Sequence, residues 1–107
     1  MNNHRNFETV WREIQHDINA GDTIRNWTQH SEYIGGEFTI RAIGAGFIEI
    51  DSPRAKNFQR VSKEDFAAVY EIWDDYNAGR VPRNQVRDLT RYSKYIISIL
   101  RHVTRAC

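Results

Sequence analysis

The chain has 107 residues, of which 12% are aromatic and 27% charged, and its formal net charge is +1. This length suits a single domain over residues 1–107 and excludes a second independent core. The one cysteine, Cys107, excludes an internal disulfide and a thiolate metal cluster, and it favours a reducing compartment, so we expect a cytoplasmic protein. No apolar run has the length of a membrane span, so no membrane partner is expected.

The first predicted element is an amphipathic helix over residues 6–20, because apolar residues such as Val10 and Ile14 recur at three- and four-residue spacing. Gly21 is expected to cap its end. β-Branched and aromatic residues then predict strands over 23–28, 37–43 and 47–51, with Gly35 and Gly36 in a turn. A last short strand over 57–61 completes a small antiparallel sheet of three or four strands.

The register of the central hairpin follows from strand alternation. A three-residue loop over residues 44–46 places Ile40 opposite Ile50 and Arg41 opposite Glu49. A two-residue loop would set Ile40 against Glu49, which mixes apolar and charged partners. We therefore predict the three-residue loop.

Two or three helices are predicted to follow the sheet. Ser62 is a suitable N-cap, Gly79 a suitable end, and Phe66, Val69 and Trp73 lie on one apolar stripe between them. Helical periodicity resumes after Pro82 and continues nearly to the last residue, either unbroken or with a turn over residues 90–93. The predicted fold class is α+β: an N-terminal helix, the antiparallel sheet, and two or three C-terminal helices.

Charge is distributed unevenly along the chain. Residues 80–107 carry seven Lys or Arg and one acidic residue, whereas residues 62–79 carry five acidic residues and one basic. On one continuous helix the basic residues would form a single stripe able to follow a nucleic-acid backbone or an acidic protein surface. This predicted anion-binding set consists of Arg80, Arg83, Arg87, Arg91, Lys94, Arg101 and Arg105.

Three other interpretations of the basic set remain open. It is a solvated helix face, or it pairs within the fold with the acidic residues Glu64, Glu71, Asp74 and Asp75. If residues 90–93 form a turn, residues 83–100 also match a helix-turn-helix, with Ser93, Lys94 and Ile97 near the start of a recognition helix.

No convincing catalytic residue, metal site or cofactor site is found. Glu13 and His16 have the spacing of half a di-metal site, but no second copy follows. Glu71, Asp74 and Asp75 are more typical of a solvated face than of a cation site. Glu49, Asp51 and Lys56 are the residue types of a metal-dependent nuclease, but their spacing is unspecific. The enzyme class is therefore the least favoured.

Several short motifs in the C-terminal half resemble those of known proteins. Asp65-Phe66, Trp73-Asp74-Asp75-Tyr76, Gly79-Arg80, Arg83 and the run from Tyr95 to Leu100 are similar to small uncharacterised bacterial proteins of the integron gene-cassette kind. The resemblance implies a bacterial cytoplasmic accessory role and no specific site residue.

Apolar residues spread over about 200° of the last helix, which is more than one sheet can cover. We expect a second copy to cover the excess in a two-fold contact through Tyr92, Tyr95, Ile97 and Ile99, with coverage inside one chain as the alternative. The predicted function is a non-enzymatic accessory binding module acting as a homo-oligomer, most simply a dimer. The alternatives are a nucleic-acid-binding domain and, less favoured, a metal-dependent hydrolase or nuclease.

Overall fold

The computed structural model describes residues 6–29, 31–53 and 55–104. Helix α1 (Phe7–Asp17) precedes an antiparallel sheet with strand order β1-β2-β3-β4, and four helices follow it. The α+β class with an N-terminal helix and C-terminal helices is therefore confirmed. Within the described ranges, no helix is both long enough and apolar enough to span a membrane.

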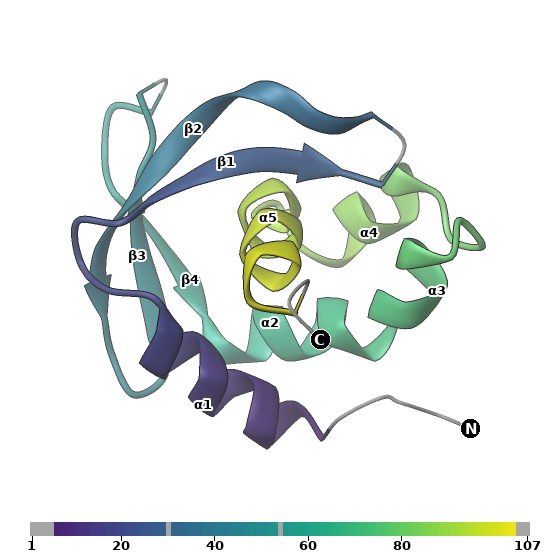
Figure 1. Ribbon diagram of the computed structural model, residues 1–107, viewed down its shortest axis with the longest axis horizontal. Helices are drawn as coiled ribbons and strands as arrows, with labels where there is room; N and C mark the ends of the chain where they lie inside the picture. The colour runs from purple at the N-terminus through teal and green to yellow at the C-terminus, as the bar shows by residue number, and fades with distance from the viewer. Residues whose placement is uncertain (1–5, 30, 54, 105–107) are drawn as a thin grey trace.

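The last helix, α5 (Ser93–Thr104), lies at the centre of the molecule. In Figure 1, strands β1 (Thr23–Thr28) and β2 (Glu32–Ile43) arch over one side of α5, and α1, α2 (Lys63–Glu71), α3 (Trp73–Asn77) and α4 (Arg83–Leu89) lie around its other sides. The side chains of Ile96, Ile97, Ile99 and Leu100 have no exposed surface. The broad apolar arc of this helix is thus covered within one chain.

Side-chain hydroxyls close the free edge of β1. Because β1 is the first strand of an open sheet, one row of its backbone N–H groups has no strand partner. The N–H of Trp27 donates to Ser98 Oγ at 3.0 Å, and the N–H of Gln29 donates to Tyr76 Oη at 3.0 Å. Helices α5 and α3 therefore supply acceptors for two N–H groups at this edge, one within β1 and one just after its last residue.

The hairpin between β2 and β3 (Phe47–Asp51) combines the predicted register with a second register that was not predicted. Ile40 lies opposite Ile50, as predicted, but Ile43 lies opposite Ile48 and Ala42 opposite Glu49. The three-residue loop is therefore wrong. A β-bulge at Arg41 absorbs one residue, so a tighter turn and the apolar pairing coexist. Arg41 still reaches Glu49, with 3.4 Å between Nε and Oε1.

Strand β2 begins at Glu32, five residues before its predicted start. The predicted turn at Gly35 and Gly36 is wrong, because both lie inside the strand. Each has a positive φ, 81° and 78°, and together they form an irregularity opposite Asn26. Glycine tolerates this conformation without steric cost, which explains how a Gly pair interrupts a strand without ending it. The final strand, β4 (Gln59–Ser62), begins two residues later and ends one residue later than predicted.

Helix boundaries differ from the predictions at two places. Helix α1 ends at Asp17, so Gly21 lies in the following turn and does not cap the helix. Ser62 is confirmed as an N-cap, because its Oγ accepts the N–H of Asp65, but the predicted single helix breaks at Ile72. This break allows Trp73 and Tyr76 to pack against Trp27, with ring centroids 6.3 and 6.5 Å away.

Candidate anion-binding residues

The predicted basic stripe is divided by a turn. Helix α4 ends at Leu89 and α5 begins at Ser93, so the alternative with a break over residues 90–93 is confirmed. Thr90 stabilises this turn, since its Oγ1 accepts the N–H of Tyr92 at 3.1 Å. The basic residues therefore do not form one longitudinal stripe. Arg105 lies outside the described residues.

The four basic residues from Arg80 to Arg91 have different environments. Arg80 precedes α4 and pairs with Asp75, with 2.8 Å between Nε and Oδ1. Arg83 is half-buried and donates from Nη1 to Ser93 Oγ at 2.9 Å, which joins the starts of the two helices. Arg87 and Arg91 are exposed. We call Arg83, Arg87 and Arg91 the α4 cationic set.

Aromatic rings hold several of the cations. The guanidinium of Arg91 lies 4.9 Å from the ring centroid of Tyr92 and donates to its hydroxyl at 2.7 Å. The ammonium of Lys94 lies 5.2 Å from the Tyr95 ring. The guanidinium of Arg101 lies 4.8 Å from the Trp27 ring. Such contacts hold the side chain but leave its positive charge uncompensated.

An ion pair joins the acidic helices to the basic set. Among the residues that the structure describes, Arg80 is the member of the set that forms an ion pair. The acidic residues Glu64, Glu71, Asp74 and Asp75 are exposed on α2 and α3. The interpretation in which the two groups pair inside the fold therefore holds for Arg80 and Asp75.

The surroundings of Arg83 disfavour its charged form. Burial lowers the pKa of Arg83 below its ordinary value, the nearby Tyr76 opposes this, and repulsion from Arg87 lowers the pKa further. The two side chains are four residues apart and so lie on one side of the helix. A bound anion would relieve this repulsion between like charges.

Helix α5 does not have the position of a recognition helix. Ser93 and Ile97, which the helix-turn-helix interpretation requires on the outside, are buried in the core. The side of α5 that carries Lys94, Ser98 and Arg101 faces β1 and its neighbours. The helix-turn-helix interpretation is therefore wrong for this fold.

The residues predicted to contact a second copy are all at least half-buried within the chain. Ile97 and Ile99 are fully enclosed, so they have no surface to offer a partner, whereas Tyr92 and Tyr95 are half-buried. The Tyr95 ring packs edge-on against Phe38, with centroids 5.0 Å apart. Homo-oligomerisation stays a prediction, but the uncovered apolar arc on which it rested is covered within the chain.

The weaker catalytic and metal interpretations have structural explanations. Glu49 accepts hydrogen bonds from Arg60 at 2.7 and 3.0 Å, so it acts as the centre of a cross-strand ion cluster with Arg41. His16 lies beside Asp17, with 3.2 Å between Nδ1 and Oδ1. The described residues contain no group of three His, Cys, Asp or Glu side chains that could hold a metal ion.

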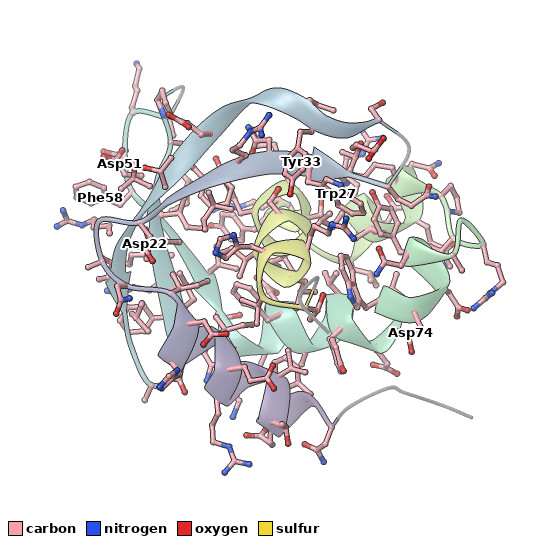
Figure 2. All side chains as sticks on the ribbon, in the orientation of Figure 1. Asp22, Trp27, Tyr33, Asp51, Phe58 and Asp74 are labelled. Carbon is pink, nitrogen blue, oxygen red and sulfur yellow. The ribbon has the colours of Figure 1, made fainter. Side chains whose placement is uncertain are left out.

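One basic residue near the predicted set was missed. Arg25 on β1 lines the same cavity as Arg101 and His102 of α5. No pattern in the sequence relates Arg25 to Arg101 and His102, because they are more than seventy positions apart. Only the docking of β1 on α5 brings them together. Figure 2 labels Trp27 and Tyr33, the two rings that lie under this part of the sheet.

Comparison with protein-family models, with curated proteins and with solved structures finds no significant match to this chain.

Proposed function

We propose that this protein is a binding module for phosphate-bearing ligands, with the backbone of a nucleic acid as its ligand and the α4 cationic set as its contact surface. Guanidinium groups bind phosphate oxygens through two parallel hydrogen bonds, and the always-charged side chain suits a polyanion. The proposed binding is independent of sequence, because contacts to phosphate carry no base information.

The observation that carries the proposal is the lack of charge compensation. Within the described chain, Arg83, Arg87 and Arg91 have no carboxylate partner, although five acidic residues precede them in the sequence. Like charges four residues apart on a helix, such as Arg83 and Arg87, repel each other by about 0.2–0.5 kcal/mol, and a bound anion offsets this repulsion. The position of Arg83 is fixed by Ser93, which gives the surface one anchored donor group.

An aromatic ring next to the set supports single-stranded over duplex ligands. Tyr92 is half-buried, and its hydroxyl accepts from Arg91. A ring with a guanidinium against it offers a platform on which an unpaired base can stack. We therefore propose that single-stranded DNA or RNA binds more tightly than duplex of equal length. The lone cysteine suits a cytoplasmic site for this binding.

Fluorescence anisotropy with a labelled single-stranded oligonucleotide tests the proposal. The double variant Arg87→Glu/Arg91→Glu should bind at least about tenfold more weakly than the parent at low salt, because two attractive contacts become repulsive. Arg12→Glu on α1 is the matched control, since Arg12 is equally exposed but lies on another helix. It should lose far less affinity.

The salt dependence gives the second readout. The logarithm of the binding constant should fall linearly with the logarithm of salt concentration, with a slope of roughly −0.7 for each phosphate contact of a single strand. Equal affinity of the parent and the double variant at low salt would contradict the proposal, as would binding that does not change with salt.

A further inference from the structure

A cavity of about 280 Å³ lies between the start of β1 and the C-terminal half of α5. Its lining combines apolar surface, to which Ile24 contributes, with basic side chains, and within the described chain no Asp or Glu side chain contributes to it. The polar residues that line it are Thr23, Arg25, Tyr33, Ser98, Arg101 and His102. Two arginines and a histidine around a small cavity without a carboxylate indicate a site for an anion.

Arg101 is held in place but incompletely satisfied. Its guanidinium stacks 4.8 Å from the centroid of Trp27, a residue with 5% of its surface exposed. The Nε atom of Arg101 is buried and has no hydrogen-bond partner in the described structure. Buried charged donors without partners are costly, and each one in a folded protein calls for an explanation such as a bound ion.

Arg25 is supported in the same way from the opposite side. Its guanidinium lies 4.4 Å from the ring centroid of Tyr33. Trp27 and Tyr33 are directly opposite each other in the pairing of β1 with β2, so their rings lie on one face of the sheet (Figure 2). A guanidinium stacked on a ring keeps its N–H donors in its own plane, where they remain available to a ligand.

Ser98 fixes the distance between the two walls of the cavity. Its Oγ accepts the N–H of Trp27 at 3.0 Å and donates to the carbonyl of Lys94 at 2.9 Å. This buried bridge joins β1 to α5 at the floor of the cavity. The arginines therefore project from two elements whose separation is set before any ligand arrives, which lowers the cost of binding.

We propose that this cavity binds a single phosphate group. Two guanidiniums, an imidazole and the hydroxyl of Thr23 supply more donors than the two oxygens of a carboxylate can accept, whereas a phosphate monoester presents three oxygens and nearly two negative charges. The volume lies near the lower end of the roughly 300–1,000 Å³ that small-molecule pockets occupy, so the cavity has room for a phosphate group. Exposed Arg25 and His102 give access from solvent.

The site is separate from the α4 cationic set. Its arginines come from β1 and from the last turns of α5, and neither proposal depends on the other. An experiment can therefore support phosphate binding in the cavity and contradict nucleic-acid binding by the α4 cationic set, or support the second and contradict the first.

Titration of the ¹⁵N-labelled protein with inorganic phosphate, followed by two-dimensional NMR, tests the site. At constant ionic strength, saturable shifts are expected for the Nε–H signal of Arg101, the indole N–H of Trp27 and the backbone amides of residues 23–25. A parallel titration with glycerol phosphate distinguishes free phosphate from a phosphomonoester, and the tighter of the two names the source. Acetate is the carboxylate control and should bind at least tenfold more weakly.

Variants complete the experiment. Arg25→Gln should weaken phosphate binding about tenfold or more, because one charge-assisted pair of hydrogen bonds is lost. Arg25 is exposed, so this variant should keep the fold. His102→Ala changes a second exposed residue of the cavity and should also weaken phosphate binding. Arg12→Gln on α1 should bind phosphate as the parent does. The proposal is overturned if phosphate produces no saturable shift in the millimolar range, if acetate binds equally well, or if Arg25→Gln binds as the parent does.

Discussion

Helices α4 and α5 are neighbours in the chain and both carry basic residues, but their environments are opposite. Helix α5 buries seven of its twelve residues, and its cations Lys94 and Arg101 lie against aromatic rings. Helix α4 buries only Val86 of its seven residues, and Arg87 is exposed. A basic, periodic sequence therefore does not by itself locate a binding surface, because the width of the apolar arc decides which helix the fold encloses.

The largest effect expected from this contrast is on stability. Ile97→Ala should destabilise the protein by about 2–5 kcal/mol, since it opens a cavity in the fully buried core. Leu89→Ala on α4 is the matched control. The Leu89 side chain is 45% exposed, so its removal should change the free energy of unfolding by less than about 0.5 kcal/mol.

Urea denaturation followed by circular dichroism measures both changes. If Ile97→Ala were as harmless as Leu89→Ala, α5 would not be enclosed in the way described. A parent chain whose stability rises steeply with its own concentration would instead point to a second copy that contributes to the core.

The hydroxyl of Ser98 should have the next largest effect. Ser98→Ala leaves the buried N–H of Trp27 without a partner, which should cost about 1–3 kcal/mol. Thr104→Ala is the control, because Thr104 Oγ1 bonds to the carbonyl of Leu100 within the same helix and supports no strand. Hydrogen exchange at the Trp27 amide should accelerate in Ser98→Ala alone, and equal exchange rates in the two variants would contradict this bridging role.

Features that depend on residues close in the sequence could be predicted, whereas features that depend on residues far apart in the sequence could not. Local patterns were sufficient for the N-cap at Ser62, because the residues that make it are adjacent, whereas near Thr90 they left a continuous helix and a turn as alternatives. The break at Ile72 was not predictable, because it depends on Trp73 and Tyr76 packing against a strand far away in the sequence.

The hairpin and the candidate site illustrate the same limit. Strand alternation gave the pairing of Ile40 with Ile50, but the bulge at Arg41 depends on how the turn and the sheet fit together. The basic residues after Gly79 were visible in the sequence, whereas their separation into a set on α4 and a cavity with Arg25 was not. Nothing in the sequence relates Arg25 to Arg101 before β1 docks on α5.

A smaller effect is expected for the ion cluster on the outside of the sheet. The hydrogen bond from Arg60 lowers the pKa of Glu49 most, burial opposes it, and the charges of Arg60 and Arg41 lower it further. Because the folded-state pKa lies below the unfolded-state value, ionised Glu49 stabilises the fold above the unfolded-state pKa. This contribution disappears as the pH falls through the folded-state pKa.

Glu49→Gln should therefore destabilise the protein at neutral pH, and the difference from the parent should narrow in acid. Denaturation curves at several pH values measure this difference. In an Arg60→Gln background the effect of Glu49→Gln should be smaller at neutral pH, because its main partner is already absent. A difference that widens in acid would contradict the assigned sign.

The most direct test of the proposed function is to map a bound oligonucleotide on the protein by NMR. We predict that a short single strand shifts the backbone amides of α4 and of residues 90–92 and the Nε–H signals of Arg83, Arg87 and Arg91, while the amides of the enclosed residues of α5 change little. Shifts confined to α1, or none at all at low salt, would contradict the account.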